Sequence, residues 1–203
     1  MRPVDSPSAK EADAAAPALV VFCGMTASGK STLAAAWAAQ AGAPHWNTDR
    51  VRKELVGLRA TDRRPDAVGQ GIYTASLSEL TYRTMLERAR EDLDRGESLV
   101  LLDGSYARRQ DRDAVRALAR QIGARCGIVF CTCSEEETRR RFDLRLRDAA
   151  AVSDGRWEIY QHQLRTFERP DPEVEPDCLL LDTTGKTVEE MLAWLKTQSW
   201  TRV

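Results

Sequence analysis

The chain has 203 residues, 42% of them hydrophobic, and a formal net charge of −1. This length suits one α/β domain with a full core, and the near-neutral charge argues against a broad electrostatic surface for duplex nucleic acid or acidic membrane. No segment approaches the roughly 20 apolar residues of a membrane span, the first residues lack the apolar core of a signal peptide, and five irregularly spaced cysteines do not make a disulfide framework. We therefore expect a cytoplasmic protein with reduced cysteines, without a membrane partner or a stable duplex nucleic-acid partner; its oligomeric state does not follow from the sequence.

Beyond a short tail, apolar runs alternate with helical stretches along the chain. Residues 1–17, rich in Ala, Pro and Ser, predict a disordered tail, and residues 18–203 predict one domain. Strands are predicted at residues 19–23, 45–48, 99–102, 127–133 and 178–181. Helices are predicted at residues 30–41, 50–56, about 72–95, 111–122, 135–147, 154–168 and 188–196. The alternation predicts an α/β fold whose parallel sheet is covered by helices on both faces, with ligands bound beyond the carboxyl ends of the strands.

The first predicted strand runs into a phosphate-binding P-loop. Residues 24–31 read Gly-x-x-x-x-Gly-Lys-Ser, between an apolar run and an Ala-rich helical segment. The glycines permit backbone angles at which successive N–H groups surround a β-phosphate at the positive end of the next helix. Lys30 would reach the β- and γ-phosphates, and the Ser31 hydroxyl would hold Mg²⁺. The alternative is a glycine-rich turn without a ligand. The residues predicted to bind the nucleotide are Gly24, Thr26, Ala27, Ser28, Gly29, Lys30, Ser31 and Thr32.

The second predicted strand is followed by a candidate catalytic base. Asp49 comes directly after this strand, and Arg52 lies three residues on, about one helical turn, so both side chains can face one cleft. A kinase needs a base near the acceptor hydroxyl and a group that binds the substrate or a phosphate. We assign these two roles to Asp49 and Arg52. The alternative for Asp49 is the N-cap of the helix predicted at residues 50–56, and the residues alone favour neither role.

The third predicted strand ends in Asp103. A carboxylate in this position holds Mg²⁺, directly or through water, in P-loop enzymes. The predicted metal ligands are therefore Ser31 and Asp103. A cap or a turn is the alternative role for Asp103. Gly104 beside it would allow a ligand or the P-loop backbone to approach closely.

The densest positive charge lies in residues 139–147, on a predicted helix. Arg141 and Arg145 are four residues apart and share one face of this helix, whereas another face is apolar. In a lid that closes over ATP, such arginines neutralise charge in the transition state and exclude water. We therefore predict that Arg141 and Arg145 contact phosphate and act in catalysis.

Together these segments resemble the P-loop kinase-like ATP-binding domain that occurs alone in bacteria or fused behind an aminoglycoside-phosphotransferase-like domain, and that is related to polynucleotide 5′-kinase and zeta-toxin-type kinases. The P-loop is highly specific by itself, and the other stretches gain weight from their order and spacing. The matching stretches are residues 24–32, 48–53, 71–73, 101–103 with Arg112, Arg141-x-x-x-Arg145, and Ser153-Asp154 followed by Tyr160, Gln163 and Phe167-Glu168.

The resemblance implies a P-loop kinase domain over residues 18–203, with a three-layer P-loop NTPase fold, a five-stranded parallel sheet of order 2-3-1-4-5 and a helical lid that carries arginines. It also implies ATP, Mg²⁺ and a hydroxyl group as phosphate acceptor. In the polynucleotide kinases an Asp-x-x-Arg after the second strand supplies the base and a substrate-contacting arginine. Asp49 and Arg52 fill that pattern, which favours a catalytic Asp49 over a cap. The sequence departs from the family at residues 104–106, Gly-Ser-Tyr in place of the commoner Ala-Thr-Phe, a departure that bears on the acceptor pocket more than on the ATP site.

Two functions fit these residues. The first is a small kinase that phosphorylates a hydroxyl of a small molecule or of a nucleic-acid end, and the near-neutral charge favours the small molecule. The second is an ATP-binding or ATPase regulatory module without a dedicated acceptor. A nucleoside monophosphate kinase is a weaker third, because no clear base-recognition segment lies between residues 56 and 70. Replacement of Asp49 by Asn separates the first two, since only a kinase needs the base.

Overall fold

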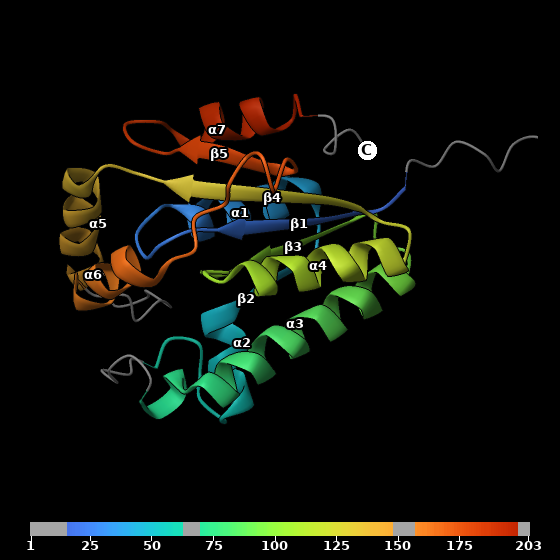
Figure 1. Ribbon diagram of the computed structural model, residues 1–203, viewed down its shortest axis with the longest axis horizontal. Helices are drawn as coiled ribbons and strands as arrows, with labels where there is room; N and C mark the ends of the chain where they lie inside the picture. Colours follow the sequence, from blue (N-terminus) through green and yellow to red (C-terminus); the bar gives the residue numbers. More distant parts are fainter. Residues whose placement is uncertain (1–15, 63–69, 148–156, 199–203) are drawn as a thin grey trace, which may run out of the picture.

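The computed structural model describes residues 16–62, 70–147 and 157–198. Its centre is a five-stranded parallel sheet with the strand order β2-β3-β1-β4-β5 (Figure 1). The sheet and the order 2-3-1-4-5 that the sequence predicts are confirmed. The strands are β1 (Ala18–Cys23), β2 (His45–Asn47), β3 (Leu99–Asp103), β4 (Arg125–Thr132) and β5 (Cys178–Asp182).

Helices cover both faces of the sheet, which confirms the three-layer α/β architecture. Buried side chains of α1 and α7 pack on one face, and those of α2, α3 and α4 pack on the other. Within the described residues the helices are α1 (Lys30–Ala41), α2 (Thr48–Leu55), η1, a 3₁₀ turn (Gly71–Tyr73), α3 (Ala75–Asp94), α4 (Arg109–Gln121), α5 (Glu135–Arg147), α6 (Trp157–Thr166) and α7 (Val188–Leu195).

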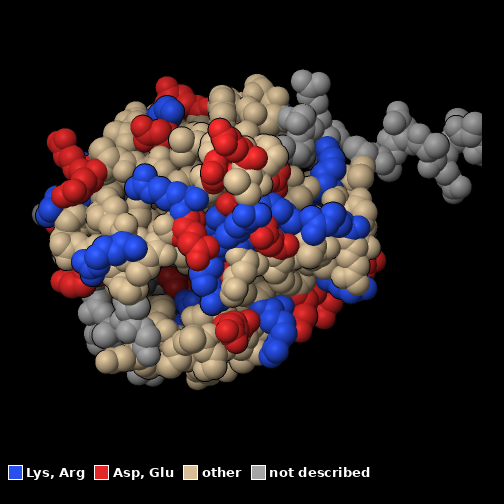
Figure 2. All heavy atoms as spheres, viewed as in Figure 1, with Lys and Arg blue, Asp and Glu red and all other residues tan. Residues whose placement is uncertain are grey.

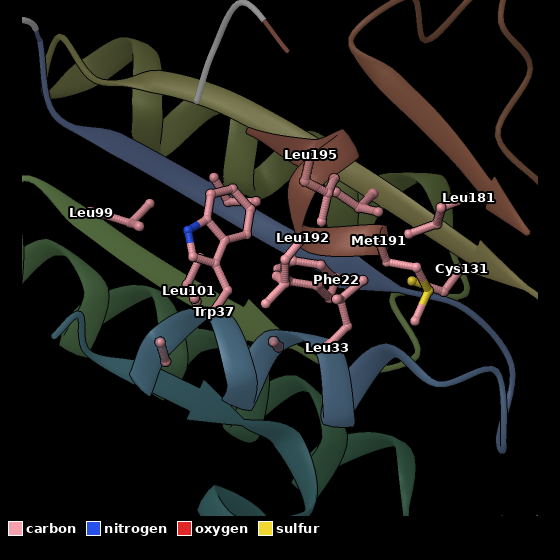
Figure 3. Close-up of a cluster of buried hydrophobic side chains, with 14 of the residues drawn as sticks. Phe22, Leu33, Trp37, Leu99, Leu101, Cys131, Leu181, Met191, Leu192 and Leu195 are labelled. Atoms are coloured by element: carbon pink, nitrogen blue, oxygen red, sulfur yellow. The ribbon is translucent and has the colours of Figure 1, made fainter. Parts of the chain in front are cut away.

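The central strand β1 is buried on both faces. Successive side chains of a strand point to opposite faces, so Phe22 packs toward α1 and α7 whereas Val21 packs toward α3 and α4. Figure 3 shows Phe22 among the side chains of α1, where its ring meets that of Trp37 edge to face with centroids 5.8 Å apart. Burial on both sides explains the continuous apolar sequence of β1. This rigid strand carries the P-loop at its carboxyl end.

The helix predicted from about residue 72 is divided in the structure. Residues Gly71–Tyr73 form η1, and α3 begins only at Ala75. Thr74 between them is extended, and its side chain caps α3 by accepting a hydrogen bond from the Leu77 N–H. The division turns Tyr73 toward α2, where its ring lies 4.9 Å below the guanidinium carbon of Arg52.

Two other helix boundaries bear on the predictions. The helix predicted at residues 50–56 begins at Thr48, before Asp49. The helix predicted at residues 154–168 is described from Trp157, and the predicted cap Ser153-Asp154 lies outside the described residues. Residues 1–15 of the predicted tail lie outside them as well.

None of the helices in the described residues is long and apolar enough to cross a bilayer. The five cysteines are free thiols, as predicted. Burial raises the pKa of Cys131 to about 12 and that of Cys126 also to about 12. These thiols are therefore core residues rather than nucleophiles at neutral pH.

Candidate active site

The carboxyl ends of the strands meet at one edge of the sheet and bring the predicted site residues together there. The P-loop follows β1, α2 follows β2, and Asp103 ends β3 (Figure 1). Thr183 follows β5, and its hydroxyl donates to the Ser28 carbonyl in the P-loop at 2.9 Å. This edge is the candidate active site.

The P-loop has backbone features that suit an anion-binding loop. Gly24 begins it at φ +141°, and a Cβ there would lie 2.3 Å from the carbonyl oxygen of Cys131, so no larger residue fits. Helix α1 follows with Gly29 as N-cap, and no side chain among the described residues caps it or places an acidic group in its first turn. The positive end of the helix dipole is therefore not neutralised by a capping or acidic side chain of the first turn, which suits a phosphate. The Ser28 hydroxyl is buried and has no hydrogen-bond partner among the described residues, which also fits a site built for a ligand.

Lys30 folds back over the P-loop. Its Nζ donates to the carbonyl oxygen of Met25 at 3.1 Å, close to the beginning of the loop. An ammonium group held there lies where the β- and γ-phosphates of a nucleotide would be bound. The position of Lys30 is thus compatible with its predicted role.

Asp103 and Ser31, the predicted metal ligands, are in contact. Asp103 is fully buried, and its Oδ1 accepts a hydrogen bond from the Ser31 hydroxyl at 3.0 Å. Its other oxygen, Oδ2, accepts from the Asn47 amide at 2.6 Å and lies 3.5 Å from His45 Nε2. The carboxylate is held by other side chains and caps no helix. Hydroxyl and carboxylate oxygens beside a phosphate cradle are the donors that Mg²⁺ prefers, so the pair fits this ion.

Asn47 is a site residue that the sequence reasoning did not name. Its Nδ2 donates to Asp103, and its Oδ1 accepts from the Arg50 N–H at 3.0 Å, which makes Asn47 the N-cap of α2. One amide thus connects the predicted metal ligand Asp103 to the helix that carries Asp49. An Asn directly before a predicted helix is a typical cap signal, so its capping role could have been found, whereas its bond to Asp103 depends on the tertiary fold.

Asp49 lies in the first turn of α2 and is not its N-cap. Its carboxylate accepts a hydrogen bond from Arg52 Nη1 at 3.0 Å and is partly accessible. The Arg52 side chain is buried, stacks over Tyr73, and has no hydrogen-bond partner for its Nε among the described residues. The capping alternative for Asp49 therefore falls away, because Asn47 fills that position. The base and substrate-binding roles remain predictions.

Arg141 contacts the P-loop through a backbone carbonyl group of the loop, that of Ala27. Its Nη1 donates to the Ala27 carbonyl at 3.0 Å and to the Thr183 hydroxyl at 2.9 Å, and its Nε donates to Glu137 at 2.7 Å. Hydrogen bonds from Arg140 and Arg141 lower the pKa of Glu137 to about 2. Arg141 therefore ties α5 to the P-loop, and its predicted phosphate contact would require it to exchange one of these bonds.

Arg145, the second predicted lid arginine, belongs to α5. Its side chain lies outside the described part of the structure. Its contact with phosphate stays a prediction.

Arg112, one of the stretches that carry the family resemblance, does not reach the site edge. It is fully buried in α4 and forms a two-pronged ion pair with Glu175, at 2.8 Å from Nε and 2.6 Å from Nη2. Its Nη1 donates to the Tyr106 carbonyl at 2.9 Å. Burial alone raises the pKa of Glu175, but the hydrogen bonds from Arg112 and Arg116 outweigh burial and lower it. Arg112 thus connects α4 to the turn after β3 through the Tyr106 carbonyl.

Gly104 lets β3 and α2 approach each other. A Cβ at this position would lie 2.5 Å from Cγ2 of Thr48, the first residue of α2. The expected close neighbour was a ligand or the P-loop backbone, and the structure shows α2 instead. Because glycine stands here, Asp103 comes close enough to bond Asn47.

The architecture is shared with small-molecule kinases of known structure. A sugar kinase from Janibacter sp. aligns with a TM-score of 0.62 and 20% identity over 90% of this chain and 94% of that chain. The APS kinase of Mycobacterium tuberculosis, solved with AMPPNP and APS, aligns with a TM-score of 0.57 and 18% identity over 90% of this chain and 96% of that chain. The chain therefore has the fold of the P-loop NTPase kinases.

Sequence relatives match a shorter stretch. An uncharacterised protein of Mycobacterium tuberculosis and one of Mycobacterium bovis are each 34% identical over 116 residues, 57% of this chain. The match covers 23% of the length of these curated relatives. The model of the AAA domain family matches residues 19–170. This range is most of the chain and contains the P-loop, Asp49, Asp103 and α6. The chain therefore belongs to this family.

Proposed function

We propose that this chain is an ATP-dependent kinase of the cytoplasm that transfers the γ-phosphoryl group, with Mg²⁺, to a hydroxyl group of a small molecule. In this proposal the P-loop binds the phosphates and Lys30 neutralises them. Ser31 and Asp103 hold the metal ion, Asp49 is the base, and Arg52 binds the acceptor.

The observation that carries the proposal is a hydrogen-bonded connection from the P-loop to the helix that carries the candidate base. Ser31 donates to Asp103, and Asn47 donates to the other oxygen of the same carboxylate. Asn47 in turn caps α2, the helix of Asp49 and Arg52. The connection joins the P-loop, the buried carboxylate of Asp103 and the helix of the partly accessible Asp49, which follow the neighbouring strands β1, β3 and β2, and this supports a cradle, a metal ligand and a base in one site. A protein that only bound ATP would need the first two and not the third.

In the proposed reaction the acceptor oxygen attacks the γ-phosphorus while Asp49 takes the hydroxyl proton. A new oxygen–phosphorus bond forms, the bond between the γ-phosphorus and the β,γ-bridging oxygen breaks, and ADP leaves with the bonding electron pair. Mg²⁺ supplies neutralisation of the phosphate charge. The chain itself supplies position, because Arg52 holds Asp49 in place through its Nη1.

Two observations favour a small acceptor over a nucleic-acid end. Figure 2 shows Asp and Glu beside the Lys and Arg side chains of the visible face, and the net charge is −1. The related fold also occurs in a sugar kinase and in APS kinase, whose acceptors are small molecules. The unused Nε of Arg52 favours an acceptor that offers a hydrogen-bond acceptor group.

The proposal is tested by ADP production from Mg·ATP across a panel of sugars, nucleosides, aminoglycosides and 5′-hydroxyl oligonucleotides. A kinase shows an acceptor-stimulated rate, and mass spectrometry finds that acceptor heavier by one phosphoryl group. Tight binding of ATP with no stimulation by any member would favour the regulatory module. Failure of the chain to bind Mg·ATP at all would refute both functions.

A further inference from the structure

The amide side chain of Gln163 is inserted at the mouth of the P-loop. Its Oε1 accepts a hydrogen bond from the Thr26 backbone N–H at 2.7 Å, across 137 residues of sequence. Gln163 belongs to α6, the helix that follows α5 among the described residues.

The peptide group that Gln163 contacts is also the one that Lys30 contacts. Lys30 Nζ donates to the carbonyl of Met25, and the N–H of the same Met25–Thr26 peptide group donates to Gln163. The carbonyl and the N–H of a trans peptide point in opposite directions, and the described residues contain no cis peptide bond. Lys30 and Gln163 therefore flank one peptide group from opposite sides. Because Lys30 serves the β- and γ-phosphates of a bound nucleotide, the Met25–Thr26 peptide group lies at that end of the cradle, and Gln163 contacts it from the side opposite to Lys30.

The orientation of the Gln163 amide follows from its partner. A backbone N–H can only donate, so Oε1 faces Thr26 and the Nε2 group, with two N–H donors, faces away from it. Within the described residues the side chain of Gln163 makes no hydrogen bond other than that with Thr26. Two donors are thus held beside the Met25–Thr26 peptide group of the P-loop and are not used by the described residues.

Packing holds α6 in this place. Met25 and Ala27 of the P-loop form a buried apolar cluster with Phe142 of α5 and Tyr160 of α6, and Phe167 packs against it. Tyr160 lies three residues before Gln163 and Phe167 four residues after it, so this face of the segment is turned toward the P-loop. The side chain of Gln163 is therefore positioned by the core of the lid.

We infer that Gln163 is the group by which the lid distinguishes ATP from ADP: held through Oε1 by Thr26, it donates from Nε2 to the γ-phosphoryl group and positions that group for transfer. The inference rests on the proposed function, since it requires ATP in the P-loop. It adds a phosphate contact to those of the P-loop backbone and Lys30. A hydrogen bond to a charged phosphoryl group in this position contributes more than one between neutral groups.

The test is equilibrium binding of Mg·AMPPNP and Mg·ADP to the full chain, wild type against Gln163→Glu. A carboxylate still accepts the Thr26 hydrogen bond, but it repels the γ-phosphoryl group. We expect affinity for Mg·AMPPNP to fall by about tenfold or more, while affinity for Mg·ADP stays within about twofold. The matched control is Gln161→Glu, an exposed glutamine of the same helix with the same change in charge, which should keep the wild-type preference.

A second variant, Gln163→Leu, removes both the acceptor and the donors. If Gln163 only ties α6 to the P-loop, Gln163→Leu weakens both nucleotides equally and Gln163→Glu weakens neither, and this pattern overturns the inference. An unchanged preference in Gln163→Glu overturns it as well, while wild-type binding leaves the proposed function intact. Absence of wild-type binding to either nucleotide refutes the proposed function and the inference together.

Discussion

Arg52 and Arg112 are both buried arginines paired with a carboxylate, yet their guanidinium groups are used differently. Each of the three nitrogens of Arg112 donates to the protein, to both oxygens of Glu175 and to the Tyr106 carbonyl. Arg52 donates to Asp49 through Nη1, stacks on an aromatic ring, and has no partner among the described residues for its Nε. The carboxylate of Arg112 is buried, whereas that of Arg52 is partly accessible.

The difference separates a structural arginine from a candidate ligand-binding one. A buried donor without a partner is unfavourable by about 1–3 kcal/mol, so it is retained where a ligand or water satisfies it. Arg112 lies below the turn after β3 and has no such donor. Arg52 lies at the carboxyl edge of the sheet beside the candidate base. The two arginines should therefore respond oppositely to substitution.

The largest effect is expected on stability, from Arg112→Met. The substitution leaves Glu175 buried without its two-pronged partner, which lowers the free energy of unfolding by about 3–5 kcal/mol. Urea denaturation measures it. Arg109→Met on the same helix, an exposed residue, should change stability by less than about 0.5 kcal/mol. A loss of activity in Arg112→Met without a loss of stability would contradict the structural role.

For Arg52→Met we expect a loss of activity with little change in stability. Loss of a charged hydrogen bond to the acceptor should lower kcat/KM for the acceptor by about 10- to 100-fold, while the KM for ATP and the stability change little. Steady-state kinetics with the acceptor found in the panel measure the ratio. Arg90→Met, an exposed arginine at the far end of α3, serves as control. Equal effects of Arg52→Met on ATP and on acceptor would show that Arg52 is not specific to the acceptor.

A smaller effect is expected from Asn47→Ser, which separates the two bonds of Asn47. Serine caps α2 almost as well as asparagine but cannot reach Asp103. The positioning of the metal ligand should be lost, and we expect the Mg²⁺ concentration for half-maximal activity to rise about tenfold. Asn47→Ala removes the cap as well and should cost about 1 kcal/mol of stability in addition. An unchanged Mg²⁺ dependence in both variants would exclude a positioning role.

The smallest effect, on stability at low pH, is expected from Glu137→Gln, which replaces the carboxylate that accepts a hydrogen bond from Arg141 Nε. The pKa of Glu137 is lowered from 4.5 to about 2, first by its hydrogen bond with Arg140 and also by that with Arg141. A carboxylate with a lowered pKa stabilises the fold above its unfolded pKa, and this contribution is lost as the pH falls from about 4.5 to about 2. Glu137→Gln should flatten the stability curve in that range and leave stability at pH 7 slightly lower. A curve as steep as that of the wild type would contradict the assignment.

Much of the fold could be predicted from the sequence because its signals are local. The apolar run of β1 and the P-loop after it mark the centre of a parallel sheet, and the family resemblance supplied the strand order. The cap alternative for Asp49 was decided only by the structure, since Asn47, Thr48 and Asp49 are all good residues for a helix start. Their order in the chain does not show which of the three residues caps α2.

Contacts that support the fold and the candidate site join residues far apart in sequence. The Arg112–Glu175 pair and the Thr26–Gln163 bond span 63 and 137 residues. No periodicity encodes such a pair, because it depends on how α4 and α6 pack on the sheet. The sequence analysis named Arg112 and Gln163 only as part of the family resemblance, whereas the structure shows Arg112 paired with Glu175 and Gln163 bonded to the P-loop.

The central claim is that Asp49 is the base of a phosphoryl transfer, and the most direct measurement is transfer to the identified acceptor by wild type and Asp49→Asn at saturating Mg·ATP. We expect a loss of about 10²- to 10⁴-fold in kcat, with unchanged affinity for Mg·ATP, and no loss in the exposed control Asp94→Asn. Transfer by Asp49→Asn within about threefold of the wild type would contradict the claim.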